Sequence, residues 1–401
     1  MPITHRQIRR QLAFLPVYIV MGYLWVTLIL NFTTPGLKAK TGLLKGADFL
    51  HFYTLGAIVR SGDLTALYDM ERLNQVADTV VPEAKGMRYM PAWGPQVALL
   101  FAPFAALPYG WALTAWSAVT LVVYAICGRA IWRRTPALAR DGPLVALLAA
   151  LSPALHNLIA YGQTSILAFA AFSLAYLAFQ ANRPMLAGAA IGLLVYKPQL
   201  GLAAAVVFVV CRDWRVIAGA LTTGLGQLAF AWLFAGTATM RAYVDTLLGL
   251  LRHAAAFEPF PHEAHSLRGT FRLLLPESAV GPVAAIAAVP VLIAAILVWR
   301  SGAPLPLKFM ALMLATVLVS PHLISYDLVL TLIALVPLWG WLRTQEMLGA
   351  TRATAVLAYL VYLSPAILIA KLVHVQPTTA SMLLLLATLT WIARRPALST
   401  T

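Results

Sequence analysis

The sequence predicts an all-α membrane protein, a polytopic bundle of about twelve spanning helices in one domain, residues 1–401. Composition is the first observation: 61% of the residues are hydrophobic and only 11% are charged, whereas soluble domains carry about a quarter charged residues. The second is that the apolar residues form long runs, and a hydrocarbon core of about 30 Å requires about 20 apolar residues in a helix. The third is that basic residues separate these runs in small groups.

The apolar runs place the expected spans in order along the chain. They cover residues 11–31, 111–132, 143–160, 163–180, 185–197, 198–211, 214–235, 281–299, 305–321, 323–342, 351–370 and 376–393. The fifth and sixth are short, and residues 185–211 could also form one helix broken at Lys197-Pro198. The first run follows a charged start and has no small-residue cleavage site after it. We therefore interpret it as an anchor rather than a cleaved signal peptide.

The distribution of basic residues predicts the orientation. Alternate short loops carry Arg6, Arg9 and Arg10; Arg129, Arg133, Arg134 and Arg140; Arg183; Arg212 and Arg215; Arg300 and Lys308; Arg343 and Arg352; Arg394 and Arg395. Short loops rich in arginine and lysine stay in the cytoplasm, so both termini are expected there, in a multi-pass protein of the cytoplasmic (inner) membrane. The formal charge of +15 is explained in this way. Because no basic patch contains interleaved aromatic residues, we expect no nucleic-acid partner.

Two long loops, residues 32–110 and 236–280, then fall on the extracytoplasmic side. In the first loop, the apolar spacing from Leu73 to Val80 after a cap at Asp69 predicts a short amphipathic helix on the bilayer. The apolar, proline-broken residues 91–104 are interpreted as a helix that dips into the outer leaflet. A full span there would move the arginines after residue 132 to the outside, against the charge rule.

Polar residues in the two long loops and at the ends of the expected spans converge on this extracytoplasmic face. They are Asp48, His51, Arg88, Tyr89, Tyr161, Gln163, Lys197, Gln199, His265, Arg268, His322, Tyr326 and Asp327. Ionisable groups near membrane depth are expensive and usually functional. This convergence predicts an active site on the outer surface of the membrane.

The residue types in this set suggest a base beside an anion-binding group of cations. Asp48 is the first acidic residue of the chain, and a single carboxylate can take a proton from an attacking sugar hydroxyl. The candidate ligands of a donor phosphate or substrate are His51, Arg88, Tyr89, Gln163, Lys197, His265, Arg268 and His322. One base without a second, nucleophilic carboxylate implies inversion at the anomeric carbon. Structural interpretations stay open: Asp48 as a helix cap, His51 as a packing residue, Lys197 and Arg88 as interfacial anchors.

Absent motifs narrow the function. There is no phosphate-binding glycine loop for ATP, no dinucleotide fingerprint and no zinc pattern of cysteine and histidine. Cys127 and Cys211 lie at the ends of apolar runs, which gives little support to a disulfide. The loops contain no closely spaced pair of aspartates of the kind that holds a nucleotide sugar through a metal ion. The sugar donor is therefore expected to be carried by a lipid. We assign no metal site and no cofactor, and leave a divalent metal open.

Taken in order, these residues resemble glycosyltransferase family 87 of the GT-C superfamily of membrane enzymes. The resemblance rests on Gly46–Tyr53, Leu67-Tyr68-Asp69, Tyr89-Met90-Pro91, Leu99–Phe104, Gly162-Gln163, Lys197-Pro198-Gln199, His265–Gly269 and Ser320-Pro321-His322. It implies an inverting hexosyltransferase with a polyprenyl-phosphate sugar donor, mannose in the characterised members, and a lipid or glycan acceptor. It also implies that Asp48 is the base and that His322 faces the donor phosphate. Some relatives carry a second acid where this chain has Gln163, which argues against a two-acid metal site.

Other functions remain alternatives at this stage. About twelve spans is also typical of a secondary transporter or a flippase for lipid-linked glycans, although carriers usually show two related halves. A polymerase or ligase of lipid-linked glycans would use the same outer-face chemistry with a different acceptor.

Overall fold

The computed structural model describes residues 5–253, 261–366 and 375–395, and these residues form helices joined by turns. Two isolated β-bridges, Lys38 with Leu44 and Ala264 with Ile324, are the strand-like pairings in this part of the chain. The all-α fold class predicted from composition is therefore confirmed for the described residues.

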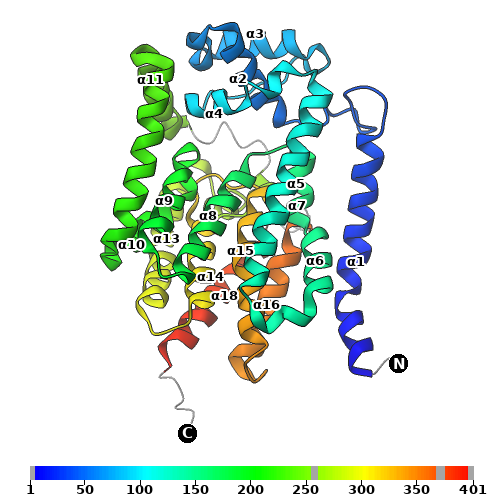
Figure 1. Cartoon of the computed structure of the whole chain (residues 1–401), viewed down its shortest axis with the longest axis vertical. Coiled ribbons are helices and arrows are strands. Elements are labelled where there is room, and N and C mark those ends of the chain that lie inside the picture. Colours follow the sequence, from blue (N-terminus) through cyan, green and yellow to red (C-terminus); the bar gives the residue numbers. More distant parts are fainter. Residues whose placement is uncertain (1–4, 254–260, 367–374, 396–401) are drawn as a thin grey trace.

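A cap of short helices lies across one end of a larger bundle (Figure 1). The cap, residues 46–106, contains α2 (Phe49–Ser61), η1 (Leu64–Tyr68), α3 (Met70–Val80) and α4 (Pro95–Phe101). It has a small apolar core of its own, made of Leu55, Ile58, Ala66, Leu67, Leu73 and Ala98. The start of α1 (His5–Phe32) and the end of α18 (Pro377–Arg394) both lie at the opposite end of the molecule.

The bundle consists of the helices that follow the cap. They are α5 (Tyr109–Arg133), α6 (Gly142–Ala150), α7 (Pro153–Tyr161), α8 (Ser165–Gln180), α9 (Pro184–Gly192), α10 (Leu202–Cys211), α11 (Trp214–His253), α12 (Leu267–Arg272), α13 (Glu277–Arg300), α14 (Leu305–Val319), α15 (Val329–Leu342), α16 (Gly349–Leu363) and α18.

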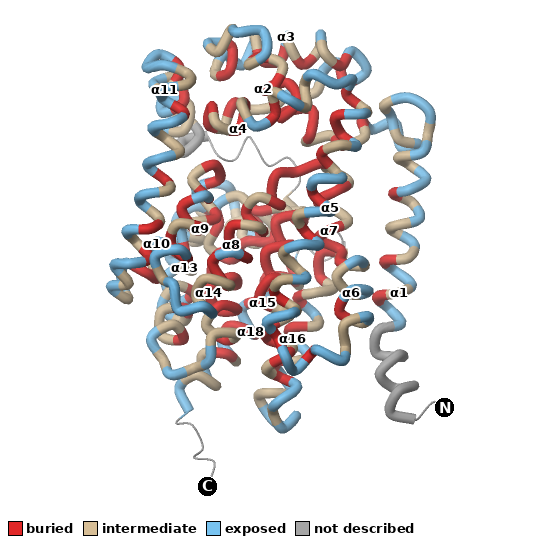
Figure 2. The backbone as a smooth tube through the Cα atoms, in the orientation of Figure 1, coloured by how far each residue is buried: buried red, intermediate tan, exposed pale blue. Residues whose placement is uncertain are grey.

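Burial separates the inner from the outer helices. Helix α14 is buried along most of its length, and α8 and α15 pack against it at the centre of the bundle (Figure 2). By contrast, α1 and α11 expose large apolar side chains, such as Tyr23 (68% exposed) and Leu233 (88% exposed). Broad apolar surfaces of this kind mark a membrane-facing side, which fits the predicted membrane protein.

Fewer helices can span a membrane than the apolar runs predicted. Five of the described helices are long and apolar enough: Leu15–Phe32, Tyr109–Arg133, Trp214–Gly249, Glu277–Arg300 and Ser325–Leu342. A sixth is formed if Pro136–Ala150 and Pro153–Tyr161, which meet at 42°, act as one broken span. Four more apolar helices have only 10–17 residues. The prediction of about twelve spans is therefore not confirmed. Residues 185–211 form two helices, α9 and α10, separated at Lys197 by two short turns.

The two long loops are more helical than expected. Helix α3 confirms the amphipathic helix, and the Asp69 carboxylate accepts hydrogen bonds from the backbone N–H groups of Glu71 and Arg72 as its cap. Helix α4 has seven residues, which is too short for a full span. The end of the span predicted at residue 235 coincides with a break in α11 at Gly236, where φ is 77°, but the residues that follow form a second helical piece up to His253 rather than an irregular loop. A glycine tolerates this left-handed backbone, so the helix resumes after it.

Candidate functional site

Asp48 lies immediately before α2, where backbone hydrogen bonds hold its loop against the bundle. The Tyr109 hydroxyl lies 2.9 Å from the carbonyl oxygen of Lys45 and 2.8 Å from that of Gly46. The Tyr89 hydroxyl donates to the carbonyl of Ala47. Gly46 has φ of 62°, and a Cβ on it would lie 2.5 Å from a methyl carbon of Leu113. The positive φ favours glycine at this position, and a larger residue would also have to displace the Leu113 side chain.

A second loop meets Asp48 from the bundle. Gly162 ends α7 in the left-handed conformation, with φ of 69°. A Cβ on Gly162 would lie 2.6 Å from the Cβ of Phe49, the first residue of α2. This close approach brings the next residue, Gln163, to the Asp48 side chain. The Gln163 Nε2 donates to Asp48 Oδ2 over 2.8 Å, and it also lies 3.1 Å from the Tyr326 hydroxyl.

The surroundings of Asp48 favour its protonated form up to a higher pH than is usual for an aspartate. Burial raises its pKa to about 6. The hydrogen bond from Gln163 and the positive charges of His322 and Lys197 oppose this rise, and the negative charge of Glu263 adds to it. A carboxylate with a pKa close to the working pH is suited to general-base catalysis. His322 and Lys197 are thus close enough for their charges to act on the Asp48 carboxyl.

Lys197 forms an ion pair inside the bundle. Its Nζ lies 2.5 Å from Asp327 Oδ1, and the two side chains are 3% and 0% exposed. The Ser165 hydroxyl also donates to Asp327. The Lys197 Nζ lies 5.4 Å from the ring centre of Tyr326, the tyrosine that Gln163 contacts. Lys197 thus contributes positive charge near Asp48, but Asp327 neutralises much of it.

The His265–Gly269 motif and the His322 segment pack side by side. The backbone N–H of His265 donates to the carbonyl of Leu323 over 3.1 Å, beside the bridge between Ala264 and Ile324. The Arg268 Nη1 donates to the carbonyl of Pro321 over 3.1 Å. Burial lowers the pKa of His265 to about 4, so this imidazole is neutral at physiological pH. Arg268 brings a positive charge next to the His322 segment, and its Nη2 also lies 3.7 Å from Glu277 Oε1.

Arg88 and His51 occupy different surroundings from those expected of phosphate ligands. Arg88 is 50% exposed and forms a two-point ion pair with Asp78, with both N–O distances 3.1 Å. Burial lowers the pKa of His51 to about 3, so its side chain is neutral. The His51 ring packs against Phe52 and Tyr89, with ring centres 5.9 and 5.1 Å apart. Tyr89 itself contributes to the site through the Asp48 loop that it holds.

Glu263 is a site residue that the sequence reasoning missed. Its Oε2 lies 3.5 Å from the Tyr161 hydroxyl, and its charge acts on Asp48. Its position in the sequence could have indicated this role, because Glu263 lies two residues before the His265–Gly269 motif. In the described residues, no three histidine, cysteine, aspartate or glutamate side chains are grouped closely enough to hold a metal ion.

Comparison with known proteins places these residues in a family. The model of glycosyltransferase family 87 matches residues 92–321, which is more than half of the chain. The chain belongs to glycosyltransferase family 87. The resemblance carried by the sequence motifs is thus confirmed, and the protein is a membrane glycosyltransferase that uses a sugar donor and an acceptor. No curated protein and no solved structure matches the chain.

The matched region of the family 87 enzyme contains Gln163, Lys197, Glu263, His265 and Arg268. Asp48 lies before this region and His322 directly follows it. The structure therefore adds the cap loop with Asp48 to the residues covered by the family match.

Proposed function

We propose that this family 87 glycosyltransferase moves a hexose, with mannose as the first candidate, from a polyprenyl-phosphate sugar to a hydroxyl of a lipid or glycan. The reaction inverts the anomeric carbon and takes place on the extracytoplasmic face of the inner membrane. The observation that carries the proposal is the partly buried Asp48 carboxylate, which accepts a hydrogen bond from Gln163 and lies close enough to His322 and Lys197 for their charges to act on it.

In the proposed reaction, Asp48 accepts the proton of the acceptor hydroxyl as that oxygen forms a bond to the anomeric carbon. The bond between this carbon and the phosphate oxygen breaks, and the phosphate leaves with the electron pair. Fixed positive charge stabilises the leaving phosphate, and Arg268 is the candidate group, with His322 as a candidate hydrogen-bond donor to the phosphate. Because Asp327 already pairs with Lys197, Lys197 is assigned a role in the local field rather than direct phosphate binding.

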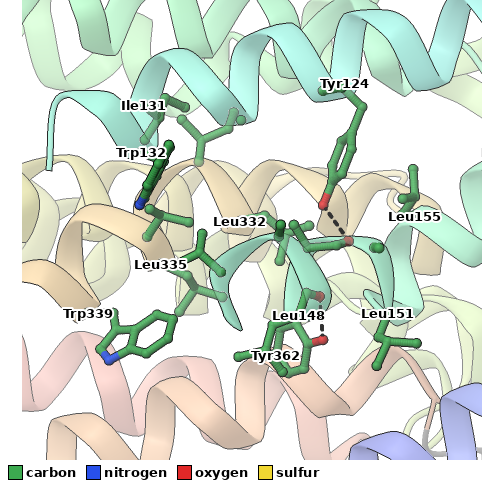
Figure 3. A pocket seen from close by; sticks show the side chains of 18 of the residues that line it. Tyr124, Ile131, Trp132, Leu148, Leu151, Leu155, Leu332, Leu335, Trp339 and Tyr362 are labelled. Carbon is green, nitrogen blue, oxygen red and sulfur yellow. Dashed lines mark hydrogen bonds between the residues drawn. The ribbon is translucent and has the colours of Figure 1, made fainter. Parts of the chain in front are cut away.

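A large apolar cavity supports a substrate with a long hydrocarbon chain. Its volume is about 1130 Å³, and its walls come from α1, α5, α6, α7, α8, α15 and α16. Two of its tyrosine hydroxyls are satisfied by backbone carbonyls: Tyr124 donates to Ala149 over 2.9 Å and Tyr362 to Leu148 over 2.7 Å (Figure 3). The remaining surface is mainly apolar, which suits an apolar occupant.

The cavity and the Asp48 site lie at the two ends of α7. Leu155, near the start of this helix, lines the cavity, and Gly162-Gln163 at its end contacts α2 and Asp48. A nine-residue helix is about 13 Å long. A prenyl chain attached to a phosphate at the site would reach the cavity over this distance.

The purified protein in lipid nanodiscs, given radiolabelled mannosyl decaprenyl phosphate and a membrane lipid extract, tests the proposal. Sugar should appear in an organic-soluble or glycan product with the wild type and be absent with Asp48→Asn. Labelled nucleotide sugar in a parallel reaction should give no product. Product from the nucleotide sugar alone would contradict the proposed donor.

A second assay tests the cavity. Ala146 lines the cavity, so Ala146→Phe inserts a ring into it. This variant should reduce transfer from a donor with ten isoprene units more than transfer from a donor with two. Ala353→Phe, on the exposed face of α16, is the matched control. Equal loss with both donors would argue against a prenyl chain in this cavity.

A further inference from the structure

Glu263 is a partly buried carboxylate that forms no ion pair with a lysine or arginine in the described part of the chain. Other acidic residues there do form such pairs: Asp63 with Arg72, Asp78 with Arg88, Asp327 with Lys197 and Glu277 with Arg272. The hydrogen bond from the Tyr161 hydroxyl to Glu263 is long, at 3.5 Å. Burial raises the pKa of Glu263. The adjacent His262 and the hydrogen bond from Tyr161 act in the opposite direction, but the pKa of Glu263 is still raised. An ionised group removed from water is costly unless it is paired, so the fold holds this carboxylate with little compensation.

The backbone around Glu263 is held on both sides of the residue. The Gln376 Nε2, just before α18, donates to the carbonyl of His262 over 3.0 Å and to that of Ala264 over 2.9 Å. Gln376 is 1% exposed. The Ala264 bridge to Ile324 and the Thr379 hydroxyl, which donates to the carbonyl of His265 over 3.1 Å, extend this support. Contacts to two carbonyls that flank one residue hold its backbone and so set the direction of its Cα–Cβ bond.

Glu263 also lies against the aromatic part of the active site. Tyr161, which donates to it, packs edge-on against Tyr326 with ring centres 5.8 Å apart. Tyr326 in turn contacts Gln163, the partner of Asp48. The negative charge of Glu263 acts on Asp48. Two carboxylates are thus arranged around one pair of tyrosines, and only Asp48 is needed as the base.

We propose that Glu263 is a substrate-binding residue that accepts a hydrogen bond from a hydroxyl of the sugar or acceptor, with Gln376 as its positioning residue. A carboxylate that has only one long hydrogen bond in the free protein is suited to a hydroxyl, because hydrogen bonds to a charged acceptor are roughly twice as strong as neutral ones. The tyrosine rings beside it supply an apolar surface for the sugar ring. This inference rests on the proposed function, since it names how the same site holds its carbohydrate.

Sugar binding without turnover provides the test. Saturation-transfer NMR would measure the affinity of methyl α-D-mannopyranoside and its monodeoxy analogues for the detergent-solubilised protein. Glu263→Gln should weaken binding of the parent glycoside about tenfold or more. One deoxy analogue should bind equally weakly to the wild type and to the variant, because the lost hydroxyl and the lost charge belong to one hydrogen bond. Glu83→Gln, exposed in the cap, is the matched control.

Two further variants keep the inference falsifiable. Gln376→Leu should weaken glycoside binding in the same direction as Glu263→Gln while Asp48 stays in place. Glu263→Asp should recover part of the affinity. Unchanged binding of every analogue to Glu263→Gln overturns the inference. Loss of Mn²⁺ binding in this variant, together with inactivation of the wild type by a chelator, overturns it in favour of a metal ligand.

The pH profile adds a readout that a purely structural role would not move. Gln163, His322 and Lys197 act on Asp48 together with Glu263. Glu263→Gln removes the negative charge that raises the pKa of Asp48. The acid limb of the rate profile should therefore move to lower pH. If the wild type transfers no sugar in any assay, the proposed function fails, whereas the NMR result on Glu263 is still decisive for the binding site.

Discussion

Gln163 donates a hydrogen bond to the Asp48 carboxylate over 2.8 Å and joins two loops that are 115 residues apart in the chain. This bond connects the cap to the bundle at a point where a partly buried carboxylate faces positive charge. Both loops require a left-handed glycine next to a tightly packed neighbour, Gly46 at Leu113 and Gly162 at Phe49. The geometry of the site is therefore set by backbone packing as well as by the polar side chains.

The first prediction concerns the pH dependence of transfer. The base acts only when ionised, and burial raises the pKa of Asp48 to about 6. The rate should therefore rise about tenfold per pH unit below pH 6 and level off above it. Steady-state rates between pH 4.5 and 8 check this, and Asp48→Asn should lose at least about a hundredfold on the plateau above pH 6 and lack the acid limb. A rate independent of pH over this range would contradict Asp48 as the base.

The second prediction concerns stability. The folded-state pKa of Asp48 lies above its unfolded value of 3.8. The folded protein therefore binds a proton more tightly, and this stabilisation is present at low pH and is lost as the pH rises through about 6. A shift from 3.8 to about 6 corresponds to about 3 kcal/mol. Asp48→Asn avoids burying this charge, so its melting temperature should exceed that of the wild type at pH 8 and approach it at pH 4. A lower melting temperature for the variant at pH 8 would contradict this account.

Replacing Gln163 should move the pH profile in a defined direction. Its hydrogen bond lowers the pKa of Asp48, so Gln163→Leu should shift the acid limb to higher pH while the plateau rate falls. Gln163→Glu should shift it further, because a second negative charge disfavours ionisation of the first carboxylate. An acid limb that stays in place in both variants would show that Gln163 does not act on the base.

Several of these residues can be found from the sequence, because polar residues in the outer loops and at the ends of apolar runs are conspicuous in such a chain. Asp48, Gln163, Lys197 and His322 stand out in this way, and the structure brings them together. Arg88 stands out by the same rule, but its ion pair with Asp78 depends on the fold of the cap. Which cation is neutralised by a neighbouring acid is decided by tertiary contacts that spacing does not show.

The number of spans is harder to predict for a related reason. An apolar run packed inside the bundle has the same composition as one that faces lipid. Helix α14 illustrates this, because it is apolar and 15 residues long yet buried among other helices. The interruptions at Lys197 and between α6 and α7 shorten further runs. Composition therefore predicts the helical class correctly, and helix length and burial decide how many helices reach across.

For the stability of the fold, Lys197 and Asp327 should matter only as a pair. Lys197→Met leaves Asp327 uncompensated and should cost about 3–5 kcal/mol. The double variant Lys197→Met/Asp327→Leu should recover most of this stability. Its activity should still fall, because the positive charge that acts on Asp48 is lost. Thermal unfolding in nanodiscs and initial rates separate the two effects. A double variant less stable than either single variant would contradict the pairing.

The last prediction isolates the close contact between the two loops. Gly162→Ala adds a Cβ that would lie 2.6 Å from Phe49 Cβ and 3.2 Å from Leu113 Cδ1, in a left-handed conformation. Phe49 Cβ belongs to a packed helix start and cannot rotate away, so Gln163 should be displaced from Asp48 and transfer should fall sharply.

Gly42→Ala is the matched control, since Gly42 also has a positive φ, of 80°, but a Cβ on it would have nothing within 4 Å. This control should carry only the backbone strain of about 1–2 kcal/mol and keep its activity. Initial rates of both variants, compared at matched folded fraction, check the prediction, and an equal loss in the two would show that backbone strain alone is responsible.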